Sequence, residues 1–116
     1  MGKTRVKFRV YSGEQYTELE GLVDTGATFT KIPRSAASKI GLHAKYEAEV
    51  MLGDGRTMKR DLAPAEVEIE GVKRPILIAV GGDEEMPIIG YTTIEVLGFK
   101  VNSVTGKLGR TPAIEL

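Results

Sequence analysis

A chain of 116 residues is about one domain long, so we expect residues 1–116 to fold as a single domain. Its sixteen basic and sixteen acidic residues cancel, which leaves no overall field to hold nucleic acid or an anionic membrane. The lack of cysteine excludes disulfides, thiolate metal ligands and a cysteine nucleophile. A single histidine, His43, is expected on the surface and cannot build a zinc site of the usual kind, so we expect no metal and no cofactor.

The chain has no segment with the roughly 20 apolar residues that span a bilayer. Its first residues alternate basic and apolar side chains, without the continuous apolar stretch of a signal peptide. From these absences we expect a cytoplasmic protein with no membrane partner.

Residues 4–10 and 15–23 are predicted to be two strands, because apolar and polar side chains alternate along them. The two-residue turn Ser12-Gly13 would join them into a hairpin. Charged side chains then share one face of the hairpin, and apolar side chains share the other. The residues expected opposite one another are Tyr11 and Glu14, Lys7 and Glu18, Arg5 and Glu20, Val6 and Leu19, and Phe8 and Thr17.

The basic residues near the N-terminus have two interpretations. We interpret them as the solvated face of this hairpin, and the alternative is a patch that binds nucleic acid. They are Lys3, Arg5, Lys7 and Arg9.

Two short helices are expected, over residues 34–40 and from residue 92 onward. The first follows an extended segment, 30–33, and has a proline at its start and a glycine at its end. The second has the spacing of a capping box at its start and a glycine at its end. These residues are Pro33 and Gly41 in the first helix, and Thr92, Glu95 and Gly98 in the second.

The remaining elements are predicted to be strands, which makes the fold mainly β. Residues 47–52 and 57–62 flank a glycine-rich hairpin tip, Gly53-Asp54-Gly55-Arg56. A proline inside the predicted strand 72–80, Pro75, indicates an edge position or a bulge. The other strands expected are 67–69, 99–101 and 107–108.

Two segments share one plan: an apolar pair, a glycine turn, a short helix, a glycine and an apolar residue. This weak duplication indicates two similar halves related by a pseudo-twofold axis, of which only the first carries an acid. The segments run from Leu22-Val23-Asp24-Thr25-Gly26 to Ile40-Gly41-Leu42, and from Ile88-Ile89-Gly90 to Leu97-Gly98-Phe99.

The acid is Asp24, which directly follows the apolar pair Leu22-Val23 and opens the tetrapeptide Asp24-Thr25-Gly26-Ala27. The pattern predicts a carboxylate on a tight turn at the end of a buried strand. Desolvating a carboxylate is costly unless it is hydrogen-bonded or has a chemical task. The alternative is a turn-forming aspartate that only satisfies nearby backbone amides.

Three features in this order resemble the retropepsin-like aspartic proteases, single-lobe relatives of pepsin. They are Asp24-Thr25-Gly26-Ala27, the Gly53-Asp54-Gly55 hairpin, and Ile88-Ile89-Gly90 followed by a short helix. The resemblance covers nearly the whole chain and implies a closed, barrel-like, mainly β fold with one or two short helices.

The resemblance implies peptide-bond hydrolysis with Asp24, Thr25 and Gly26 as the catalytic residues. Hydrolysis without a metal needs a base to activate water and an acid to protonate the carbonyl oxygen, and two close carboxylates sharing one proton supply both. Since the chain offers one such motif, the second carboxylate must be Asp24 of another copy, in a homodimer with the site on its twofold axis. In the family, the threonine hydrogen-bonds across that axis.

The resemblance also implies a flap, residues 51–58, that folds over an extended polypeptide substrate and excludes water. The alternatives are an ordinary exposed hairpin and, for the apolar pair before Gly90, plain core. The implied substrate-binding residues are Ala27, Met51, Leu52, Gly53, Asp54, Gly55, Ile88 and Ile89.

The chain departs from the retroviral pattern at Thr28 and Tyr91, where an acidic residue and an arginine often form an ion pair. The C-terminal segment Leu108–Leu116 is expected to contribute to a dimer interface. The acidic loop 81–85 is interpreted as solvated, with cation binding as the alternative. For the whole chain, the alternative function is a non-catalytic dimerisation or peptide-binding module.

Overall fold

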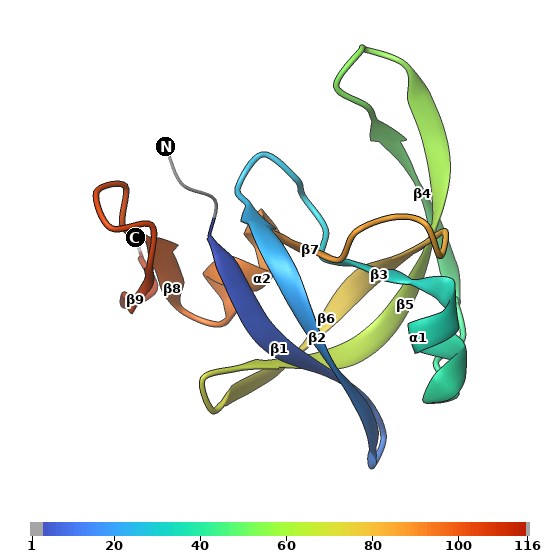
Figure 1. Ribbon diagram of the computed structural model, residues 1–116, viewed down its shortest axis with the longest axis horizontal. Helices are drawn as coiled ribbons and strands as arrows, with labels where there is room; N and C mark the ends of the chain where they lie inside the picture. Colours follow the sequence, from blue (N-terminus) through green and yellow to red (C-terminus); the bar gives the residue numbers. More distant parts are fainter. Residues whose placement is uncertain (1–3, 116) are drawn as a thin grey trace.

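The computed structural model describes residues 4–115, and Lys3 and Leu116 of the regions discussed above lie outside that range. Figure 1 shows a β structure with two short helices, one at the right of the view and the other between the main strands and the C-terminal strands. Strand β1 (Arg5–Ser12) pairs antiparallel with β2 (Gln15–Asp24), which confirms the predicted N-terminal hairpin.

The predicted register of this hairpin is wrong by two residues. Gly13 and Glu14 form the turn, with Ser12 opposite Gln15, because Gly13 adopts the left-handed conformation (φ +62°) that glycine tolerates best. Since the shift is an even number, every side chain keeps its predicted face. Lys7 lies opposite Glu20 and Phe8 opposite Leu19, while Arg9 lies opposite Glu18 and forms an ion pair with it at 3.1 Å.

The other strands of the main sheet are arranged so that the sheet closes on itself. Its order is β1-β2-β7-β3-β6-β5-β4, and the extra pairing of β1 with β5 completes the ring. The predicted fold class is therefore confirmed. The remaining strands are β3 (Lys31–Pro33), β4 (Tyr46–Met51), β5 (Thr57–Ile69), β6 (Val72–Gly81), β7 (Ile88–Gly90), and the separate pair β8 (Phe99–Val101) and β9 (Leu108–Arg110).

Strand β5 differs from the prediction because it runs unbroken through the region expected to separate two strands. Its inward residues alternate along the strand and contribute to a core that also contains Phe8, Val10, Ile78 and Ile89. In the described sheet, β6 pairs with β3 only at residues 79–81, so Pro75 lies at an edge, as predicted.

The two helices are α1 (Arg34–Lys39) and α2 (Tyr91–Val96). Helix α1 follows Pro33 and is succeeded by Gly41 at φ +68°, as predicted. The predicted capping box of α2 is wrong: the helix begins one residue earlier, after Gly90, and has no side-chain cap. Its last turn is followed by Gly98 at φ +78°, which confirms the predicted end.

The strands that open the two duplicated segments are neighbours in the ring. Strands β2 and β7 are parallel, with Leu22 beside Ile88, Val23 beside Ile89 and Asp24 beside Gly90. The residue in the second half that corresponds to Asp24 is therefore a glycine. No helix within residues 4–115 is long and apolar enough to cross a membrane.

Candidate active site

The site begins at the end of β2, where the chain turns sharply after Asp24. The Gly26 N–H donates to Asp24 Oδ1 at 2.9 Å, and the Ala27 N–H donates to the Asp24 carbonyl at 3.1 Å. These two bonds fix both the turn and the carboxylate. The expectation of a buried strand end is wrong for the single chain, because Val23 is only half-buried and Asp24, Thr25 and Gly26 are exposed.

A buried pair of threonines supports this turn from below. The Thr30 hydroxyl accepts a hydrogen bond from the Gly90 N–H at 3.1 Å and lies 2.6 Å from the Thr93 hydroxyl, with which it shares a second hydrogen bond. Both side chains are almost completely buried. Sequence reasoning missed these residues, because partners 63 positions apart along the chain leave no local pattern.

Gly90 is required at its position by close packing. A Cβ atom there would lie 2.5 Å from the carbonyl carbon and oxygen of Phe29 and 2.9 Å from the Thr30 nitrogen. Only glycine lets β7 approach the segment that follows the Asp24 turn this closely.

Backbone hydrogen bonds connect the same turn to helix α2. The Tyr91 N–H donates to the Ala27 carbonyl at 2.7 Å, and the Thr92 N–H donates to the Thr28 carbonyl at 3.1 Å. The two regions thus remain joined although Thr28 and Tyr91 cannot form an ion pair. The Tyr91 hydroxyl instead donates to the Glu95 carboxylate, which raises the pKa of Tyr91.

A cleft of about 550 Å³ lies against the Asp24 turn. It brings together four of the predicted site residues: Asp24, Ala27, Leu52 and Ile88. The others lie elsewhere: Ile89 is buried in the core, and Thr25, Gly26, Met51, Gly53, Asp54 and Gly55 are exposed outside the cleft lining. The rest of the lining consists of Thr28, Phe29, Lys31, Ala48, Glu49, Val50, Arg60 and Ala79.

The predicted hairpin tip forms the end of the β4–β5 hairpin, which projects from the body of the molecule at the upper right of Figure 1. Within the tip, Leu52 and Arg56 are joined by a backbone hydrogen bond of 2.7 Å, and Gly55 adopts φ +89°. The Asp54 carboxylate accepts hydrogen bonds from the Arg56 backbone and guanidinium at 3.0 and 2.6 Å. Met51, at 74% exposure, presents an apolar surface to solvent.

A charged cluster that the sequence did not indicate lies beside the cleft. Glu85 accepts hydrogen bonds from Lys31 at 2.9 Å, from both terminal nitrogens of Arg60 at 2.5 and 2.8 Å, and from the Gly82 N–H at 2.8 Å. The Arg60 guanidinium is the main cause that holds the pKa of Glu85 well below its usual range.

The interpretation of the 81–85 loop as solvated is therefore wrong for Glu85. A second acid of the loop, Asp83, is exposed but accepts a hydrogen bond of 2.8 Å from the Ser35 N–H at the start of α1, which lowers the Asp83 pKa. This bond caps a helix that has no cap of its own. Within residues 4–115, no group of three or more His, Cys, Asp or Glu side chains is placed to hold a metal ion.

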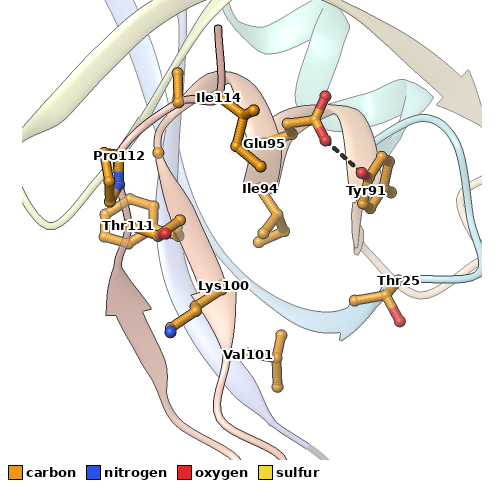
Figure 2. A pocket seen from close by; sticks show the side chains of 12 residues that line it. Thr25, Tyr91, Ile94, Glu95, Lys100, Val101, Thr111, Pro112 and Ile114 are labelled. Carbon is orange, nitrogen blue, oxygen red and sulfur yellow. Dashed lines mark hydrogen bonds between the residues drawn. The ribbon is translucent and has the colours of Figure 1, made fainter. Parts of the chain in front are cut away.

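A second hollow, of about 430 Å³, lies between α2, β8 and the segment that follows β9. Figure 2 shows Thr25 at one side of it and the Tyr91–Glu95 hydrogen bond at another, with Ile94, Val101 and Ile114 around it. Ile114 is 89% exposed in the single chain. An apolar surface thus continues from the Asp24 turn to the C-terminal segment.

Comparison with known proteins agrees with this arrangement. A model of the aspartyl protease family matches residues 6–93, and the chain belongs to that family. EIAV protease complexed with the inhibitor HBY-793 is similar in fold, with a TM-score of 0.63, 18% identity, and coverage of 84% of this chain and 89% of that one. The simian foamy virus (mac) protease has a TM-score of 0.57, 13% identity, and coverage of 78% and 91%. No curated protein matches the chain in sequence.

Proposed function

We propose that residues 1–116 form one protease domain that works as a homodimeric aspartic endopeptidase on extended polypeptide segments. The observation that carries the proposal is the position of Asp24. Its carboxylate is held by the Gly26 N–H at 2.9 Å and lies at the wall of a cleft of about 550 Å³. A cleft of this size suits a few residues of an extended peptide.

The second carboxylate comes from a second copy of the chain. The pairing of Asp24 with Gly90 supports this proposal, since the duplicated half has no acid at the corresponding position. When two copies place their Asp24 side chains in contact, like charges so close cannot both ionise, and the pair holds one proton.

The paired carboxylates then have complementary tasks. The ionised carboxylate accepts a proton from a water molecule, and the oxygen of that water attacks the carbonyl carbon of the peptide. The protonated one donates its proton to the carbonyl oxygen, which gives a tetrahedral intermediate with two hydroxyl groups. The carboxyl group that took the proton from water then gives it to the amide nitrogen, the bond from carbon to nitrogen breaks, and one hydroxyl of the intermediate returns its proton to the other carboxylate. Because this cycle needs one shared proton, activity is greatest at mildly acidic pH.

The surface around the Asp24 turn suits contact with a second copy. Thr25 and Gly26 are exposed, and the neighbouring Tyr91 and Ile114 are 49% and 89% exposed. We expect these groups and the segment after β9 to be covered in the dimer, with Thr25 at the axis. The exposed β4–β5 hairpin then acts as the flap that closes over the peptide.

The test compares the wild-type protein with Asp24→Asn in the cleavage of an unfolded protein substrate between pH 3.5 and 6.5. We expect the variant to lose about a thousandfold or more in rate while remaining a dimer in sedimentation analysis. The matched control is Asp61→Asn, which removes an exposed carboxylate that pairs with Arg34 at 3.0 Å, outside the cleft lining.

Cleavage by Asp24→Asn at the wild-type rate would refute the assignment. A wild-type protein that stays monomeric and cleaves nothing would instead support a non-catalytic peptide-binding module.

A further inference from the structure

We propose that Lys31 and Arg60, held together by Glu85, bind a carboxylate side chain of the substrate, so that the protease prefers peptides with Glu or Asp near the scissile bond. This inference rests on the proposed function. Both cations line the same cleft as Asp24, but they belong to different strands, β3 and β5. Neither was indicated by the sequence.

The first argument is the number of hydrogen-bond donors that remain. Within the described residues, Glu85 accepts two of the five N–H groups of the Arg60 guanidinium and one of the three of the Lys31 ammonium. The Glu85 oxygens are themselves saturated by these bonds and by the Gly82 N–H. Further donors of both cations are thus available to a second acceptor.

The second argument is the direction of the side chains. Arg60 lies opposite Ala48 in the β4–β5 ladder, and directly opposite residues share a face, so Arg60, Ala48 and Val50 point to the same side. Glu49 lies opposite Lys59 and leaves from the other face of this ladder, and it is exposed where it borders the cleft.

The backbone around Lys31 makes room for its side chain. A Cβ atom on Gly81 would lie 3.0 Å from Lys31 Cδ and 3.2 Å from a Glu85 oxygen, so a glycine there lets the lysine stem lie flat against the strand. The Lys31 and Arg60 side chains are 23% and 13% exposed, which leaves the charges partly desolvated and still reachable from the cleft.

The third argument is charge. Two cations and one carboxylate leave the cluster with one net positive charge. Glu85 stays ionised in mild acid because its pKa is lowered, chiefly by Arg60, so the cluster keeps this charge at the pH where a shared-proton pair works. The other acids near the cluster are Glu84, which acts on Arg60 through space, and Asp24 and Glu49, which line the same cleft.

A substrate carboxylate would therefore gain charge-assisted hydrogen bonds that a neutral side chain of the same shape cannot match. A free Glu side chain has a pKa of about 4.3. The preference for Glu over Gln must then be strong above that pH and vanish well below it, while the cluster itself does not change.

The experiment uses peptide pairs that differ only by Glu or Gln, scanned over the four positions on each side of the cleaved bond. At the position that reaches the cluster, we expect wild-type kcat/KM to favour Glu on the order of tenfold at pH 6 and to show a ratio of about one at pH 3. Lys31→Met should bring the ratio at pH 6 close to one. Arg34→Met, which removes an exposed cation paired outside the cleft, should leave it unchanged.

The ratio of kcat/KM for the Glu peptide to that for the Gln peptide does not depend on the fraction of enzyme that is folded, because the same folded molecules cleave both peptides. A purely structural role for the cluster predicts that Lys31→Met lowers the melting temperature and leaves the Glu/Gln ratio as it was, and that result would overturn the inference. So would a wild-type ratio near one at every position at pH 6.

Failure of the proposed function would look different. If no peptide is cleaved, binding of the same labelled peptides to the Asp24→Asn protein, followed by fluorescence anisotropy, still tests the cluster. Tighter binding of the Glu peptide than of the Gln peptide supports the inference without catalysis, provided that the Asp24→Asn, Lys31→Met double variant loses this difference. Equal binding of the two peptides contradicts it.

Discussion

Replacing Gly90 by alanine tests whether close packing of β7 positions the Asp24 turn. The added methyl carbon would lie 2.5 Å from the backbone of Phe29, whereas ordinary contacts begin near 3.4 Å, so the segment must move by about 1 Å. Overpacking of this kind costs about 1–3 kcal/mol. The movement also weakens the buried hydrogen bond from the Gly90 N–H to Thr30, worth about 1 kcal/mol.

Alanine also restricts the unfolded chain more than glycine does, which offsets about 0.4–1 kcal/mol of this destabilisation. The offset applies because Gly90 has a negative φ of −87°, which alanine adopts without strain. We therefore expect Gly90→Ala to lower the free energy of unfolding by about 2 kcal/mol in urea titration, and to reduce peptide cleavage because the Asp24 turn moves. Gly109→Ala is the matched control, since its added Cβ meets open space. A Gly90→Ala protein as stable as Gly109→Ala would refute the packing argument.

Three further predictions concern the buried threonines, the charged cluster and the hairpin tip. Thr30→Val should destabilise the fold by about 1–3 kcal/mol, and Thr93→Val by less, because only the first leaves a buried backbone N–H without its acceptor; equal losses in denaturant titration would contradict this. The lowered pKa of Glu85 means that its contribution to stability is complete above its unfolded-state pKa of about 4.3 and disappears as the pH falls through the lower folded value. The difference in melting temperature between wild type and Glu85→Gln should thus be widest above about pH 5 and narrow toward pH 2, and a difference that grows in acid would disprove it. Gly55→Val should reduce kcat/KM, because a β-branched residue at φ +89° is strained. Gly53→Ala should not, because Gly53 has no positive φ and its added Cβ would meet open space. A wild-type kcat/KM in the Gly55→Val protein would exclude a requirement for this tip conformation.

The sequence was most informative where a local pattern decides the structure. Gly41 and Gly98 mark the helix ends because left-handed backbone after a helix favours glycine, and both adopt it. The repeated apolar pair predicted two related halves, and β2 and β7 lie side by side with Asp24 next to Gly90.

Local patterns were misleading where one pattern fits two structures. The Ser12-Gly13 turn and the Gly13-Glu14 turn keep the same side chains on each face, so the alternation of the strands cannot distinguish them, and the backbone of Gly13 decides. The spacing of Thr92 and Glu95 fits a capping box, but α2 begins at Tyr91, whose N–H donates to the Ala27 carbonyl, and Glu95 accepts a hydrogen bond from the Tyr91 hydroxyl.

Contacts between distant segments could not be predicted from one sequence. Lys31, Arg60 and Glu85 come from two strands and a loop, and nothing in their local sequence relates them. The same holds for Thr30 and Thr93, whose hydroxyls meet beneath the Asp24 turn. Such partners are set by the closure of the sheet rather than by any one element.

Mixing wild-type protein with Asp24→Asn measures most directly whether the site needs one aspartate from each of two copies. After subunit exchange with nine parts of variant to one of wild type, random pairing leaves about one tenth of the wild-type subunits paired with another wild-type subunit. The account predicts that cleavage activity per wild-type subunit falls to about one tenth, with Asp61→Asn in place of the variant giving no loss. Activity per wild-type subunit that stays constant, in samples where exchange is verified by mass spectrometry of labelled subunits, would contradict a shared active site.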